Sequence, residues 1–83
     1  MTSDEFNNKY KNYLEERHYG LAIDKESVVD FLDNIFKDLI EIPDFKYSQI
    51  KLKFGYARFY STLLSTELSS LIENKINSLI HDE

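Results

Sequence analysis

The stretch FKYSQIKLKFGYARFYSTLL, residues 45–64, decides the fold, because its apolar pattern fits two different structures. Tyr56, Phe59 and Leu63 follow one another at intervals of three and four residues, the spacing of one face of an α-helix. Residues 50–54 instead alternate apolar and basic side chains like a half-buried strand, and the glycine after them suits a turn or bulge. We favour the helix, because the alternation is short and no partner strand is evident.

The segments on either side of this stretch predict further helices. Apolar spacing predicts helices over residues 4–18, 25–41 and 66–80, and the first is followed by a glycine that suits a helix C-terminus. Pro43 ends the second helix, because the residue before a proline avoids the α region. No Gly or Pro follows Gly55, so the helices over 45–64 and 66–80 could merge into one. The expected fold is an all-α compact bundle of three to four helices.

Length and composition limit the architecture further. A chain of 83 residues is expected to form a single helical domain over 1–83, too short for a dinucleotide-binding fold or a TIM barrel. The absence of Cys excludes disulfide scaffolds and thiolate metal sites. The N-terminal residues do not resemble a signal peptide, and no apolar run is long enough to span a membrane. We therefore expect a cytoplasmic protein that does not act at a membrane.

Catalytic chemistry has no support in the sequence. His18 and His81 lack the spacing of metal ligands, and the serines lack the context of an activated nucleophile. Neither glycine belongs to a phosphate-binding loop. We therefore expect no catalytic residue, no metal site and no cofactor, and we predict that the protein is not an enzyme.

Charge is distributed unevenly along a chain whose formal net charge is −5. Residues 24–44 contain seven acids and two lysines, whereas residues 45–60 contain four cations and no acid. The acids of the second predicted helix form either a solvated surface or a face that mimics a polyanion or docks on a basic protein. That acidic face consists of Glu26, Asp30, Asp33 and Glu41.

The predicted helix over 45–64 is apolar around most of its circumference. A helix of this kind must be buried on most sides, and the other segments of so short a chain can cover only part of it. It is therefore either the central core helix or a contact surface for another chain. The candidate partner-binding residues are Leu52, Tyr56, Arg58, Phe59 and Leu63.

These features together predict a non-catalytic protein–protein interaction module, an inhibitor or an adaptor, that forms a homodimer and binds a partner of unknown identity. The composition, rich in Asn, Lys, Ile, Tyr and Phe, suggests an AT-rich bacterial, phage or plasmid genome. The alternative is a nucleic-acid-binding module that uses residues 45–60, where cations alternate with aromatic residues. We give this alternative less weight, because four cations in an acidic chain are a small electrostatic footprint.

Overall fold

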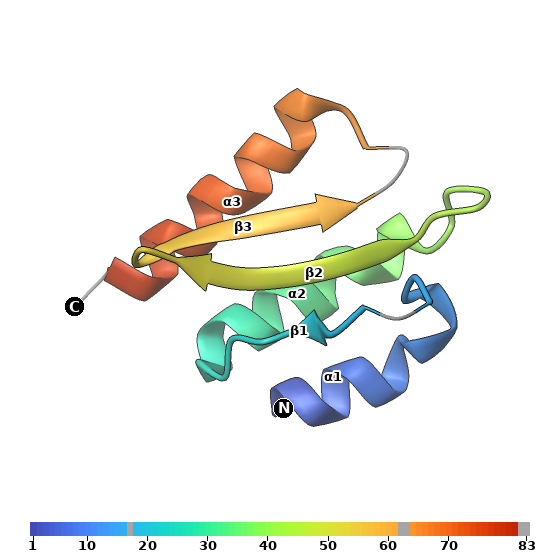
Figure 1. Ribbon diagram of the computed structural model, residues 1–83, viewed down its shortest axis with the longest axis horizontal. Helices are drawn as coiled ribbons and strands as arrows, with labels where there is room; N and C mark the ends of the chain where they lie inside the picture. Colours follow the sequence, from blue (N-terminus) through green and yellow to red (C-terminus); the bar gives the residue numbers. More distant parts are fainter. Residues whose placement is uncertain (17, 62–63, 82–83) are drawn as a thin grey trace.

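The chain folds into helices packed against a small mixed sheet, in a computed structural model that describes residues 1–16, 18–61 and 64–81. The elements in chain order are α1 (Ser3–Lys9), the 3₁₀ helix η1 (Lys11–Tyr13), β1 (Gly20–Leu21), α2 (Glu26–Leu39), β2 (Tyr47–Lys53), β3 (Tyr56–Ser61) and α3 (Thr66–His81). Strand β2 lies in the centre of the sheet, with β1 parallel to it on one side and β3 antiparallel on the other. Helices α2 and α3 lie on one side of the sheet, and α1 lies beside β1 (Figure 1).

The all-α prediction is wrong, because the segment predicted as a helix over 45–64 forms the hairpin of β2 and β3. The merged long helix does not form either, since β3 ends at Ser61 and α3 begins at Thr66. The predicted helices over 25–41 and 66–80 correspond to α2 and α3. The physical reason for the error is that β2 and β3 satisfy each other's backbone groups across a two-residue turn, which spacing along the chain did not reveal.

Helix α1 begins as the sequence suggests but ends early. Thr2 and Glu5 form a capping box: the Thr2 hydroxyl accepts from the Glu5 N–H at 3.1 Å, and the Glu5 carboxylate accepts from the Thr2 N–H at 3.0 Å. The predicted helix over 4–18 stops at Lys9, because the chain then turns to run alongside β2. There Leu14 bridges Tyr47, and the Glu15 N–H donates to the Tyr47 carbonyl at 2.8 Å. Pairing with the sheet thus replaces the rest of the helix.

Asparagine side chains from two helices cover the outer edges of the sheet. At β1, the Leu21 N–H donates to Asn7 Oδ1 at 2.8 Å, and Asn7 Nδ2 donates to the Leu21 carbonyl at 2.9 Å. At β3, the Ala57 N–H donates to Asn77 Oδ1 at 2.7 Å. Unpaired edge groups are templates for pairing with other chains. Asn7 therefore satisfies both main-chain groups of Leu21 at the β1 edge, and Asn77 satisfies one main-chain group at the β3 edge.

Gly20 must be a glycine for two reasons. Its φ is +74°, a left-handed conformation that side chains disfavour. A Cβ at this position would also lie 2.5 Å from Asn7 Oδ1, closer than real carbon atoms approach. Gly20 does not end a helix, although the sequence predicted that it would; its positive φ serves the start of β1 and the approach of Asn7.

An aromatic cluster centred on Phe36 of α2 forms the middle of the core. Among the described residues, five other rings lie with centroids 4.9 to 6.4 Å from the Phe36 ring, all at steep interplanar angles. Tilted and edge-to-face pairs of this kind are the preferred geometry of aromatic side chains. The cluster joins α1 and α2 to the hairpin. Its outer members are Phe6, Tyr10, Phe45, Tyr47 and Phe59.

Candidate functional site

The turn between β2 and β3 sets the arrangement of the candidate site. Its two central residues, Phe54 and Gly55, have φ values of 54° and 82°. Positive φ at both positions is the mark of a type I′ turn, whose twist matches that of the flanking strands. The turn places Lys53 opposite Tyr56, and the ladder continues from there towards Gln49 and Tyr60. The register of the hairpin is therefore fixed from the turn outward.

Alternation along the two strands sorts their side chains onto two faces. Ile50, Ala57 and Phe59 point into the core and are at most 5% exposed. The intervening residues lie on the other side of the sheet from this core. We call this side the open face. It consists of Gln49, Lys51 and Lys53 on β2 and Tyr56, Arg58 and Tyr60 on β3.

The cations of the open face lie close together, with no acidic partner among the described residues. Lys51 lies directly opposite Arg58 in the ladder, and Lys53 follows on the same face of β2. None of these three side chains forms an ion pair with any residue that the structure describes. Like charges directly opposite each other on a sheet destabilise it. The open face therefore holds positive charge at a cost to folding.

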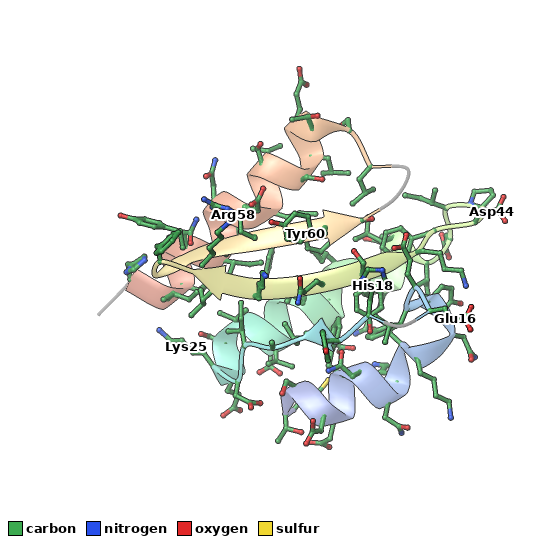
Figure 2. The ribbon with its side chains drawn as sticks, in the orientation of Figure 1. Glu16, His18, Lys25, Asp44, Arg58 and Tyr60 are labelled. Atoms are coloured by element: carbon green, nitrogen blue, oxygen red, sulfur yellow. The ribbon has the colours of Figure 1, made fainter. Side chains whose placement is uncertain are left out.

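Two exposed tyrosines flank the arginine on β3. Tyr56 is 56% exposed and Tyr60 is 44% exposed, so neither ring belongs to the core. Figure 2 shows Arg58 and Tyr60 along the same strand. Alternation places Tyr60, Arg58 and Tyr56 in one row, each two residues from the next. The row offers aromatic, cationic and aromatic groups in succession.

His81 at the end of α3 supports the Tyr56 end of this row. Its ring lies 5.6 Å from the Tyr56 ring, and its Nε2 lies 3.0 Å from the Gly55 carbonyl oxygen. The Lys25 ammonium in turn donates to the carbonyls of Leu79 and Ile80 in the last turn of α3. A cation suits the negative end of a helix. The His81 contacts hold the turn of the hairpin against α3, and Lys25 links the start of α2 to the end of α3.

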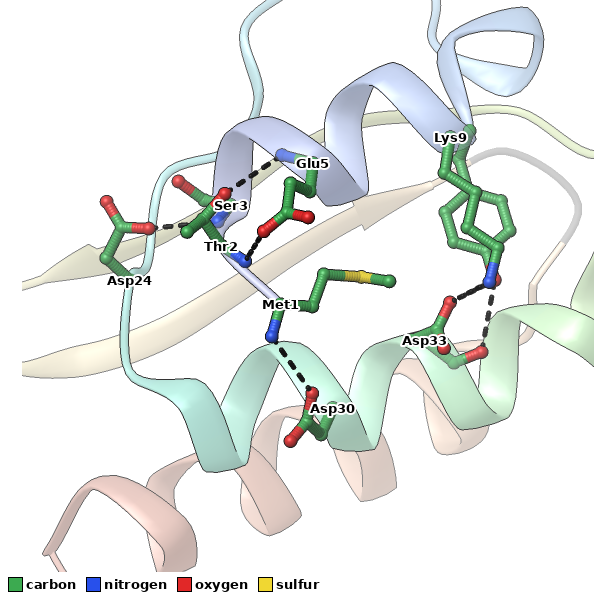
Figure 3. A network of polar contacts seen from close by, with 9 residues as sticks. Met1, Thr2, Ser3, Glu5, Lys9, Asp24, Asp30 and Asp33 are labelled. Carbon is green, nitrogen blue, oxygen red and sulfur yellow. Dashed lines mark hydrogen bonds and ion pairs between the residues drawn. The ribbon is translucent and has the colours of Figure 1, made fainter.

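Acidic side chains lie on the opposite side of the molecule. The buried side of α2 faces the sheet, so its exposed acids point away from the open face. Asp30 lies 3.7 Å from the N-terminal ammonium, and Asp33 lies 2.7 Å from Lys9 Nζ (Figure 3). The protein therefore has a basic face and an acidic back, which its net charge alone does not reveal.

Asp33 is bound within the fold and is not free on the acidic face. The Tyr10 hydroxyl donates to its carboxylate at 2.6 Å, in addition to the Lys9 contact. Burial alone would raise the pKa of the Asp33 carboxyl, but the hydrogen bonds from Lys9 and Tyr10 and the charges of Lys9 and Lys37 hold that pKa below its usual value. Glu26, Asp30 and Glu41 of the predicted acidic face are exposed.

The predicted partner-binding residues do not form one row, because their segment is not a helix. Tyr56 and Arg58 lie on the open face. Leu52 belongs to the inner side of β2 but is 44% exposed near the end of the sheet. Phe59 packs against Phe36 in the core. Leu63 lies outside the described residues.

The alternative assignment, a basic and aromatic segment over 45–60, included most of the open face. The structure buries Phe45, Tyr47 and Phe59 and exposes the other aromatic residues of that segment. Lys46 does not belong to the open face, and its ammonium donates to the Asn12 carbonyl at 2.8 Å. Gln49 was not named as a candidate, although extending the alternation of residues 50–54 by one residue towards the N-terminus would have included it.

The described residues form neither a pocket nor a metal-binding cluster. Within residues 1–16, 18–61 and 64–81 there is no pocket and no group of three or more potential metal ligands. No helix in the described part of the chain is long and apolar enough to cross a membrane. No family model matches this sequence, and comparisons with curated proteins and with solved structures find no match either. Function is therefore inferred from the residues of the open face.

Proposed function

We propose that this protein binds single-stranded nucleic acid on the open face of its sheet. Sequence-tolerant binding of single strands combines cations that contact the backbone with aromatic rings on which bases stack. The open face provides both cations and aromatic rings, on neighbouring positions of one side of the sheet. The observation that carries the proposal is the Lys51–Arg58 pair, two opposite cations flanked by exposed Tyr56 and Tyr60. Within residues 1–16, 18–61 and 64–81, no acid forms an ion pair with either cation.

The tyrosines favour a single strand over a duplex. The faces of the bases in a duplex are already stacked, and a protein can reach only their edges and the phosphates. An exposed tyrosine ring gains most from a base whose face is free. The acidic back supports the same orientation, because it repels phosphates while the open face attracts them.

Salt-titrated fluorescence anisotropy with unstructured, labelled oligonucleotides of about twelve nucleotides tests this proposal. If Lys51, Lys53 and Arg58 contact phosphates, the slope of log K against log salt should be about −2 for single strands. Both DNA and RNA strands should be measured, with a duplex of the same sequence as a comparison. Absence of salt-sensitive binding to any single strand, at low ionic strength, would refute the proposal.

A matched pair of variants separates the open face from general charge. Lys51→Gln with Arg58→Gln should weaken binding and reduce the slope to about −0.7, since one cation remains. Lys37→Gln with Lys75→Gln changes the net charge equally, at exposed positions on α2 and α3, and should bind nearly as well as the original protein. Equal losses of affinity in the two double variants would show that binding depends only on net charge and not on the open face.

Loss of an exposed tyrosine should affect binding differently from loss of a cation. Tyr56→Ala and Tyr60→Ala should each cost about 1–3 kcal/mol of binding free energy and leave the salt slope unchanged, because no charge is removed. Circular dichroism should confirm that both variants fold, as exposed side chains contribute little to the core.

A protein partner is the second candidate, supported by the exposed acids Glu26, Asp30 and Glu41 on the back of the molecule. A basic protein surface would fit this face. Reversing Asp30 and Glu41 to lysine should then abolish capture of that partner while leaving nucleic-acid affinity intact. The homodimer also stays a prediction, which molar mass from light scattering tests directly.

A further inference from the structure

We infer that Phe54, at the tip of the hairpin, is a third base-stacking residue that extends the open face past the end of the sheet; this inference rests on the proposed function and specifies it further. Phe54 is 89% exposed, so its ring contributes little to the core. It occupies the first central position of the turn, immediately after Lys53. An aromatic side chain here needs a reason other than folding.

The turn itself disfavours phenylalanine. Both central residues of a type I′ turn have positive φ, and Asn, Asp and Gly are the residues that occupy these positions most readily. Phe54 has a φ of 54°, in the left-handed region that bulky side chains avoid. Asn-Gly would form the same turn with less strain. The sequence thus keeps a large exposed ring where a smaller residue would fold better.

The position of Phe54 connects it to the open face. Lys53 Nζ lies 5.9 Å from the centre of the Phe54 ring, so a cation of the open face sits beside this ring. Tyr56 is two residues further along the chain, at the near end of the Tyr60–Arg58–Tyr56 row. A strand that follows this row towards the turn reaches Phe54 next. A base on its ring would place the adjoining phosphate near Lys53.

Spacing along the row also specifies the form of the ligand. Tyr56 and Tyr60 are four residues apart on one strand, which corresponds to about 13 Å. Neighbouring stacked bases in B-DNA are about 3.4 Å apart along one strand. Two bases that lie on these two rings are therefore too far apart to be stacked directly on each other. The ligand is a single strand whose base faces are accessible to the rings, and DNA and RNA present the same chemistry to them.

Phe54→Asn tests the inference, because stability and binding should change in opposite directions. The urea midpoint should rise, since Asn suits the turn, while affinity for the single strand should fall about 5- to 150-fold with an unchanged salt slope. Phe54→Tyr keeps an aromatic ring and should restore most of the affinity. A 2-aminopurine base placed along the oligonucleotide should be quenched at one position by the original protein and not by Phe54→Asn.

The outcomes separate this inference from the proposed function. If the original protein binds and Tyr56→Ala weakens binding, but Phe54→Asn binds normally, the role of Phe54 is refuted and the proposed function stands. If the original protein binds no single strand, both are refuted. If Phe54→Asn abolishes binding to anionic lipid vesicles or to a second protein while nucleic-acid affinity is unchanged, Phe54 serves a different ligand and the inference is refuted. A lower urea midpoint for Phe54→Asn would refute the argument that Phe54 destabilises the turn.

Discussion

The side-chain amide of Asn7 forms two hydrogen bonds with the main chain of Leu21, and so occupies the place of a further strand at the edge of the sheet. A helix thereby supplies the donor and the acceptor that the edge strand β1 needs. The same Asn7 oxygen also lies 3.3 Å from the Tyr47 hydroxyl, which donates to it from the central strand. One polar side chain thus links α1, β1 and β2.

Replacement of Asn7 by alanine should lower the free energy of unfolding by about 2 kcal/mol, because the N–H and carbonyl of Leu21 lose their partners in a partly buried site. Urea denaturation followed by circular dichroism measures the change. Asn8→Ala, at an exposed neighbouring position on α1, is the matched control and should change stability by less than about 0.5 kcal/mol. Similar losses in both variants would mean that the edge contact is not the cause.

Asn77 makes a corresponding contact at the other edge, and Asn77→Ala should cost about 1 kcal/mol. Amide hydrogen exchange, followed by NMR, should be accelerated at Ala57 in this variant more than at neighbouring β3 amides. Asn77→Asp keeps an acceptor oxygen and should restore protection at Ala57. Asn74→Ala, at an exposed position of α3, should leave the Ala57 amide unchanged.

The stabilising contribution of Asp33 should disappear in acid. Its pKa is lowered in the folded protein, since the contacts from Lys9 and Tyr10 outweigh the opposing effect of burial. The carboxylate therefore stabilises the fold fully above its unfolded pKa of about 3.9, and this contribution is lost as the pH falls through the lower folded pKa. The stability difference between the original protein and Asp33→Asn, from urea curves between pH 7 and pH 2, should shrink below pH 4. A constant difference would contradict this assignment.

Tyr47 should make the fold sensitive to alkali. Burial, with a smaller effect of Tyr10, raises the pKa of Tyr47 to about 12. Because the folded pKa is raised, the neutral hydroxyl contributes fully below pH 10 and its contribution is lost as the pH rises from 10 to 12. Stability should fall by at most about 1.4 kcal/mol per pH unit for each such tyrosine. Tyr47→Phe should show a smaller decline above pH 10, and an identical decline would contradict the assignment.

The helices α2 and α3 were predictable because their patterns are local. Each carries its apolar residues at helical spacing, and Pro43 marks a limit for the first. Helix α1 was predictable only at its start, where Thr2 and Glu5 form the capping box. Its end depends on pairing with β2, a strand more than thirty residues away in the sequence. Spacing along the chain contains no information about that contact.

The hairpin was missed because its two signals were hidden. The usual mark of a type I′ turn is Asn-Gly or Asp-Gly, and this chain has Phe-Gly. Strand β3 alternates buried and exposed residues, but its exposed positions include Tyr56 and Tyr60, which are aromatic. The sequence of β3 therefore does not show the alternation of apolar and polar residues that marks a half-buried strand. The residues that disguised the strand are those that we assign to the ligand.

The sorting of tyrosines between core and open face also has a practical consequence. The chain has six tyrosines and no tryptophan, so tyrosine provides its intrinsic emission. Tyr10 and Tyr47 are fixed in an asymmetric aromatic environment, whereas Tyr56 and Tyr60 face solvent. Near-ultraviolet dichroism should therefore follow the packing of the core, and quenching of emission should follow occupancy of the outer rings. One unlabelled sample can report both events by separate optical signals.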